Sequence, residues 1–242
     1  MLPPCEPVAI RDELQRILDA LLEHDPPASA PPDQEPVPVA LSALAGALSE
    51  ALSSLARCIH GDATAAAPTL ERVGDHAVDL LERTALCAQQ AGATSAAQEL
   101  RGLLLALACC VARNGGELSH LKPVADAVAE QAELAPDPAR SRVLYQMTDD
   151  IAQGLSSKFS GASPGSERWA HWRELLLSRA VIATRTLEPQ LMAPAFDALA
   201  EELPADAAAF FSEGMDRLDY PHAVRELMQR YHDADAARGR LH

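Results

Sequence analysis

The sequence lacks aromatic residues over more than half of its length, since all nine Phe, Tyr and Trp side chains lie at or after Tyr145. Aromatic rings are large and rigid and usually dominate contact energies. The first part must therefore pack with leucine, valine, isoleucine and alanine alone, and its helices can approach closely. We accordingly distinguish an aromatic-free part, residues 39–144, from an aromatic-containing part, residues 145–242.

Positive charge is also scarce. The formal net charge is −15, and Lys122 and Lys158 are the only lysines. Such a field repels polyanions, and no basic cluster offsets it, so we expect neither nucleic acid nor an anionic membrane as a partner. The acidic excess is strongest in residues 187–235, where eleven Asp and Glu face three Arg. The preference for arginine over lysine is typical of a GC-rich bacterial genome.

Membrane and export signals are not evident. The longest apolar run, Leu103–Ala112, has ten residues, whereas a membrane span needs about 20, so this run predicts a buried core helix. Residues 1–6 contain no basic stretch that leads into an apolar one, so we expect no secretory signal. These features predict a soluble, cytoplasmic protein.

Cysteine patterns that bind metal or form a disulfide framework are absent as well. The five cysteines are odd in number and form no C-x-x-C pair, which speaks against a zinc ribbon or a set of disulfides. Cys109 and Cys110 lie within the apolar run and are expected to be buried thiols. We expect no cofactor, and a reducing compartment.

The sequence contains none of the common enzyme signatures. There is no P-loop, no G-x-G-x-x-G, no H-E-x-x-H and no G-x-S-x-G. Their absence favours a protein that is not an enzyme. A helical enzyme whose site is built from scattered side chains stays open as a further hypothesis.

Helical periodicity is present from end to end, and nothing alternates at period two for long. The fold class predicted is all-α, with about ten helices. Asp137-Pro138 predicts a helix start, with aspartate as the N-cap, and Ser95 with Gln98 matches a capping box. The expected helices cover residues 7–24, 39–60, 68–91, 94–114, 122–134, 138–158 and 167–186, and three more begin near Pro189, Pro204 and Pro221.

The N-terminal region divides into an arm and a linker. Residues 1–24 carry the first helix, and residues 25–38 hold six prolines in fourteen positions. Proline removes backbone donors and disfavours helix, so we expect a semi-extended linker and an arm that docks separately. The remaining residues, 39–242, form the main all-helical domain.

Two architectures fit ten helices with short connections. Helix pairs recur about every 40 residues, which is the unit size of helical solenoids. Our first choice is a stack of antiparallel helix hairpins resembling an α-solenoid, and the second is an irregular helical bundle. No repeat consensus is legible in the sequence.

One segment, Leu70–Asp79, carries a pattern of charged residues on a predicted helix. It resembles a motif of the phosphate-uptake regulator (PhoU) family, and the matching residues are Glu71, Arg72, Gly74, Asp75, His76 and Ala77. The resemblance implies a metal-binding regulatory helical bundle, with Glu71, Asp75 and Asp79 as the candidate metal ligands. It covers about a dozen residues, and the family's second copy of the motif is missing here. The alternative is an ordinary amphipathic helix whose acids face water.

Two groups of aromatic residues are candidates for contacts with a partner protein. Trp169 and Trp172 share one face of the seventh helix, beside Arg173, and Trp and Arg are favoured at interaction hot spots. Phe210 and Phe211 are adjacent, so both are buried only if their helix is covered on two sides. The alternative for each group is a role in the core.

These observations favour a protein-interaction or scaffold module over the metal-binding regulator and the helical enzyme. Helical arrays without motifs, metal ligands or basic patches most often present surfaces to other proteins. The expected partner is another protein, and self-association into a homo-oligomer is also open.

Overall fold

In the computed structural model the chain is described over residues 5–23, 37–61, 67–135, 137–216 and 220–239. Within these ranges it forms ten α-helices and no β-strand, which confirms the predicted all-α class. The helices are α1 (Pro7–Glu23), α2 (Val37–His60), α3 (Ala67–Gln90), α4 (Thr94–Arg113), α5 (Leu121–Glu133), α6 (Pro138–Phe159), α7 (Glu167–Thr186), α8 (Pro189–Glu202), α9 (Pro204–Met215) and α10 (His222–Gly239).

Local signals in the sequence set most helix ends. Asp137 caps α6 as predicted, because its carboxylate accepts a hydrogen bond from the Arg140 backbone N–H at 2.9 Å. The predicted capping box at Ser95 is wrong. Gly92 turns the chain at a positive φ of 80°, and α4 begins at Thr94, with Ala93 as an N-cap that makes no side-chain hydrogen bond. Ser95 therefore lies inside the first turn.

The ten helices fall into two compact units. Unit 1 comprises Met1–Ala127 with Gln153–Leu155, and unit 2 comprises Val128–Ala152 with Ser156–His242. The division thus falls within α5, about seventeen residues before the change in aromatic content at residues 144 and 145. The change in aromatic content and the boundary between the units therefore do not coincide, and the first residues of unit 2, from Val128 to Leu144, contain no aromatic side chain.

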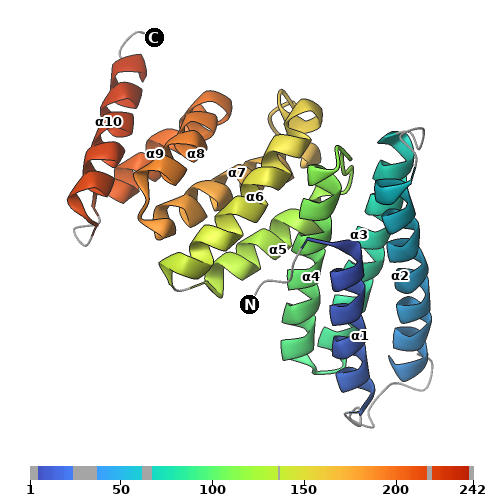
Figure 1. Cartoon of the computed structure of the whole chain (residues 1–242). Coiled ribbons are helices and arrows are strands. Elements are labelled where there is room, and N and C mark those ends of the chain that lie inside the picture. The colour runs from blue at the N-terminus through green and yellow to red at the C-terminus, as the bar shows by residue number, and fades with distance from the viewer. Residues whose placement is uncertain (1–4, 24–36, 62–66, 136, 217–219, 240–242) are drawn as a thin grey trace. The chain divides into compact units, whose positions relative to one another are not determined.

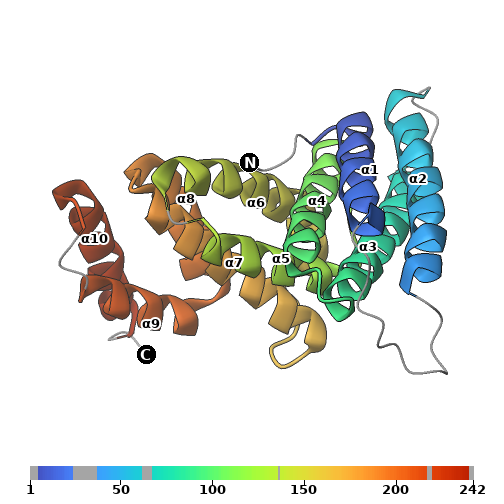
Figure 2. The ribbon, with the colours of Figure 1, turned by 90° about the horizontal axis from the view of Figure 1, so that it is seen from below.

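Unit 1 is built around four helices, α1 to α4, that run side by side (Figures 1 and 2). Each helix packs on the next, and α1 also packs on α4, so the four close into a bundle rather than an open stack of hairpins. We expected residues 1–24 to form an arm that docks separately, and this expectation is corrected, because α1 is one of the four helices of the bundle. The apolar stripe of α1, which includes Ile10, Leu14 and Ile17, is buried, and α1 packs on α2 and α4. Of the predicted linker, residues 25–36 lie outside the described residues, and Val37 and Pro38 begin α2.

The predicted core helix is confirmed, because every residue from Gly102 to Val111 of α4 is buried. Two stretches are nonetheless long and apolar enough to cross a membrane by length and composition: Val39–His60, 28% buried in its most apolar window, and Thr94–Arg113, 67% buried. A helix at the centre of a bundle is apolar all round for the same reason as a membrane span, so this test alone does not place either in a membrane.

Unit 2 packs α7 on α8, and α8, α9 and α10 on one another. Four rings form its aromatic core: Phe196 of α8, Phe210 and Phe211 of α9, and Tyr231 of α10, with neighbouring centroids between 5.1 and 5.5 Å apart. The edge-to-face and stacked arrangements suit the quadrupoles of the rings. The predicted starts at Pro189 and Pro204 are confirmed, and α10 begins one residue after Pro221.

Candidate functional site

The first candidate surface, around Trp169, Trp172 and Arg173, is mostly used inside unit 2. The Trp172 ring is buried and stacks on the ring of Phe159, with 6.0 Å between centroids. Its indole Nε1 donates a hydrogen bond to Glu202 at 3.1 Å. Trp172 is therefore a core residue that ties α6, α7 and α8 together.

Arg173 has a partner within the same unit. Its guanidinium donates two hydrogen bonds to the carboxylate of Asp206, at 2.8 and 2.5 Å, and these bonds raise the pKa of Arg173. Trp169 is half-buried, and its ring lies 5.8 Å from the Arg173 guanidinium carbon. Of the three residues, only Trp169 combines an aromatic ring with substantial exposure.

The structure separates the two adjacent phenylalanines. Phe211 is fully buried, between the rings of Phe196 and Tyr231. The Tyr231 hydroxyl lies 2.6 Å from a carboxylate oxygen of Asp197, and burial together with this bond raises the pKa of Tyr231. Phe210 is only half-buried. Phe211 is thus a core residue, whereas one part of the Phe210 ring is left to line a cavity.

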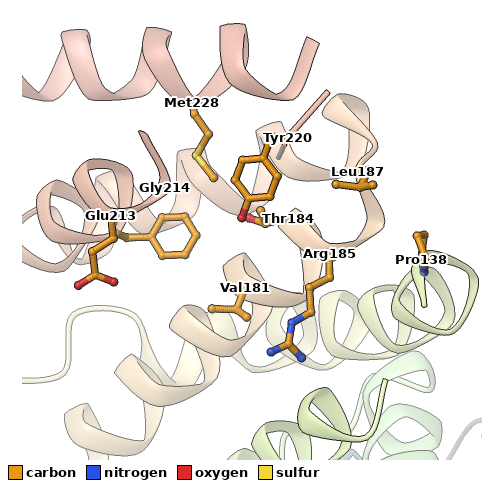
Figure 3. A pocket seen from close by; sticks show the side chains of 10 residues that line it. Pro138, Val181, Thr184, Arg185, Leu187, Glu213, Gly214, Tyr220 and Met228 are labelled. Carbon is orange, nitrogen blue, oxygen red and sulfur yellow. The ribbon is translucent and has the colours of Figure 1, made fainter. Parts of the chain in front are cut away.

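That cavity is an open groove of about 530 Å³ within unit 2 (Figure 3). We call it the unit 2 groove. Its volume lies within the ~300–1,000 Å³ typical of binding pockets. Its lining residues are Pro138, Val181, Thr184, Arg185, Leu187, Phe210, Glu213, Gly214, Tyr220 and Met228. Most of the side chains that line it are apolar or aromatic.

Leu187 shapes one end of the groove. It caps the C-terminus of α7 in the left-handed conformation, with φ 58° and ψ 22°, and no other non-glycine residue in the described ranges has a positive φ. This conformation costs a residue with a Cβ roughly 1–2 kcal/mol. Leu187 is nevertheless 37% exposed, so part of an apolar side chain in this conformation is left at the surface.

A glycine makes room for the methionine that lines the other side. A Cβ at Gly214 would lie 3.1 Å from both Sδ and Cε of Met228, so the absence of a side chain at residue 214 lets the thioether of α10 pack closely on α9. Met228 points into the same space as Tyr220, and Leu187 lies toward the far edge (Figure 3). Met228 itself is 1% exposed, so it belongs to the packed wall of the groove rather than to its open surface.

Arg185 supplies the cationic group of the groove, but its charge is already compensated. Its guanidinium donates to the backbone carbonyl of Ala132 and lies 3.5 Å from a carboxylate oxygen of Glu133. The lining has no histidine, cysteine or serine among its described residues. The Thr184 hydroxyl donates to the Ala180 carbonyl of its own helix at 2.9 Å. The Arg185 guanidinium and the Thr184 hydroxyl are thus both engaged within unit 2.

A second hollow, of about 390 Å³, lies in unit 1 between α2 and α3. Arg72 and His76, from the segment that resembles the phosphate-uptake regulators, line it beside Glu50. All three side chains are exposed, and the remaining lining residues are small or medium in size. This hollow offers no large apolar side chain for a partner to cover.

The acids of that segment have structural partners. The Asp75 carboxylate accepts hydrogen bonds from the backbone N–H groups of Ser119 and His120, at 2.7 and 3.3 Å. Glu71 accepts one from the Ser119 hydroxyl at 2.9 Å. The expectation that this whole stripe simply faces water is therefore corrected. Two of its acids hold the loop that leads into α5, because that loop otherwise leaves its donors unpaired.

The third candidate ligand, Asp79, is exposed and lies 4.0 Å from a ring nitrogen of His120. In the part of the chain that the structure describes, no three His, Cys, Asp or Glu side chains are placed together to hold a metal ion. Gly74 also has a packing role, because a Cβ there would lie 3.0 to 3.2 Å from the side chains of Val111 and Leu118. Three residues of the motif, Glu71, Gly74 and Asp75, thus make contacts within unit 1.

Comparison of the chain with known protein families, with curated proteins and with solved structures finds no match. The site must therefore be interpreted from its own geometry.

Sequence reasoning missed three residues that make the groove: Leu187, Gly214 and Met228. One signal was available, since Leu187 stands at a helix end where glycine is usual, two residues before Pro189. The roles of Gly214 and Met228 depend on how α9 meets α10, which no local pattern specifies.

Proposed function

We propose that this chain is a protein-interaction module, and that a segment of another protein docks in the unit 2 groove. The observation that carries the proposal is an open groove, lined mostly by apolar or aromatic side chains, at which the chain keeps a partly exposed leucine in a costly conformation. Exposed apolar surface beside polar residues is typical of interaction sites. Strained residues also cluster where a structure binds something.

The make-up of the groove supports binding over catalysis. Among its polar groups, Thr184 and Arg185 are engaged, Glu213 is acidic, and Tyr220 adds a phenol. A nucleophile paired with a base would favour the helical-enzyme hypothesis, and nothing of that kind lines the described part of the groove. The metal-binding hypothesis is less supported, because among the described residues no three His, Cys, Asp or Glu side chains are placed together to hold an ion.

We also propose that the protein works in the cytoplasm of a bacterial cell. All five cysteines are free thiols, which fits a reducing compartment. Burial, the largest cause, raises the pKa of Cys110 to about 12, so this thiol serves packing rather than redox chemistry.

The proposal is tested by placing a photoreactive benzoylphenylalanine at residue 187 of the full chain in its native host. We expect a discrete adduct with one protein, and we expect the purified partner to bind the wild-type chain but to bind less tightly to a Phe210→Ala variant whose fold is verified by thermal melting, because that variant loses a half-buried ring that lines the groove. The control position is Val143 of α6, which is 47% exposed and does not line the groove. Equal adducts at both positions, or none at residue 187, would contradict the proposal, and an adduct with a second copy of the chain would identify a homo-oligomer.

A further inference from the structure

The charges at the edge of the unit 2 groove are uneven. Glu213 lines the groove, and Asp216 lies one helical turn further along. Both are exposed, and neither has an ion-pair partner within the described ranges. The one basic lining residue, Arg185, is already paired with Glu133 and the Ala132 carbonyl. In the sequence, residues 213–219 hold three acids against one arginine, so the end of α9 and the residues after it carry a net negative charge.

The position of these acids on α9 increases that negative potential. Glu213 lies in the last turn of α9 and Asp216 is its C-cap, and this last turn contains no basic residue. The C-terminal end of a helix carries the negative pole of its dipole, and its carbonyls lack partners within the helix. Two acids at this end oppose the dipole, so they do not contribute to helix stability in the usual way.

Two local rules of stable sequences are thus broken at one groove. Leu187 takes a left-handed conformation that glycine usually occupies, and α9 ends on acids where lysine or arginine is favoured. Violations of this kind concentrate at functional sites, where the sequence is selected for something other than stability. Their coincidence points to an occupant that covers Leu187 and neutralises the end of α9.

We propose that the segment bound in the unit 2 groove is a basic amphipathic helix, with apolar residues toward Phe210 and Leu187 and lysine or arginine beside Glu213 and Asp216. This inference rests on the proposed function and names the chemistry of the partner. The described part of unit 2 has no β-strand whose edge could pair with an extended peptide. Insertion of an amphipathic helix into a groove is a common recognition mode that needs no strand edge.

The test uses three short designed helical peptides and the purified full chain, with binding followed by fluorescence anisotropy. The first peptide is an amphipathic helix with leucine on one face and lysine on the opposite face. The second has glutamate in place of each lysine, and the third has serine in place of each leucine. We expect the leucine–lysine peptide to bind at least about tenfold more tightly than either of the others, and more weakly as salt rises, because the charges lie at a solvent-exposed edge.

A matched pair of variants assigns the binding to the groove. Glu213→Lys with Asp216→Lys reverses the charge at the end of α9. This double variant should lower the affinity for the leucine–lysine peptide by roughly tenfold or more. This variant is expected to fold, because lysine at a helix C-terminus suits the dipole. Glu201→Lys with Glu226→Lys makes the same change in net charge at exposed positions outside the groove, and should leave most of the affinity intact.

The possible failures are distinguishable. If the glutamate peptide binds as tightly as the lysine peptide and competes for the same site, the groove still docks a helix but the basic partner is wrong. If the serine–lysine peptide binds equally well, or if both charge variants weaken binding alike, attraction to net charge explains the result and the inference is overturned. Absence of binding by all three peptides overturns it too, while the cross-linking at residue 187 decides separately on the proposed function.

Discussion

The guanidinium of Arg179 on α7 donates a hydrogen bond to the carboxylate of Asp149 on α6, and both groups lie within unit 2. The Arg179 side chain is 7% exposed and that of Asp149 21%. The Tyr145 ring lies 5.9 Å from the Arg179 guanidinium carbon, and burial raises the pKa of its phenol. This pair joins α6 and α7 through two charged groups that are largely buried.

The pair predicts an asymmetric response to mutation. Asp149→Ala leaves a buried guanidinium without its counter-charge, and should lower the free energy of unfolding by ~3–5 kcal/mol. Adding Arg179→Met should restore most of the lost free energy of unfolding, because an apolar side chain of similar length needs no counter-charge. The substitution also removes the Arg179 Nε–H, which is buried and has no acceptor among the described residues. Urea denaturation measures both values, and a loss below ~1 kcal/mol for Asp149→Ala would show that water solvates Arg179.

Two helical glycines should respond to alanine in opposite ways. Gly46 of α2 has nothing within 4 Å of where a Cβ would stand, whereas a Cβ at Gly74 of α3 meets Val111 and Leu118. Gly46→Ala should stabilise unit 1 by ~0.5–1 kcal/mol, because alanine is the better helix former. Gly74→Ala should instead destabilise unit 1, because overpacking costs ~1–3 kcal/mol. The gain in helix propensity offsets ~0.5–1 kcal/mol of that cost. Equal effects in thermal melting would mean that α3 does not pack closely on Val111.

The helices themselves were largely predictable from the sequence. Proline, aspartate and glycine set the ends of α6, α8 and α9 locally, and the apolar stripes identified the buried faces. A stripe shows that a helix is covered but not by what, which is why the packing of α1 on α4 was not foreseen. Nothing in residues 7–23 specifies Glu99 as the partner of Arg16, although the two are bonded in unit 1.

The candidate site was less predictable, for the same reason. Periodicity placed Glu71 and Asp75 on a polar face, but it could not show that a loop more than forty residues away along the chain would use them as acceptors. It identified Phe210 and Phe211 as a pair without deciding which ring is buried. That choice depends on how α8 and α10 cover α9, and such contacts between distant elements leave no local trace in the sequence.

The metal hypothesis predicts one result and the hydrogen bonds predict another. On our account, Asp75→Ala removes the acceptor of two backbone N–H groups and should destabilise unit 1 by ~1–2 kcal/mol, with the same loss in chelator and in buffer. Asp79→Ala is the control and should change stability by less than ~0.5 kcal/mol, because Asp79 is exposed. Elemental analysis should find no stoichiometric metal, and a metal that is lost with Asp75→Ala would support the regulator instead.

The adjacent phenylalanines should divide into a structural and a binding residue. Phe211→Ala should cost ~3–5 kcal/mol of stability, because the ring is fully buried. Phe210→Ala should cost less, ~1–2 kcal/mol, since part of this ring is already in water. The Phe210 variant should keep its fold and lose affinity for the cross-linked partner. Two equally unstable variants that both retain the partner would remove Phe210 from the binding surface.

The central claim is that a partner occupies the groove and not the tryptophan face of α7, and amide hydrogen exchange on the full chain tests it most directly. With the purified partner bound, we predict slower exchange in residues 181–187 and 210–216, which contain most of the residues that line the groove, and unchanged exchange in residues 167–173 around Trp169. Protection confined to residues 167–173, with the groove segments exchanging as in the free chain, would contradict the account.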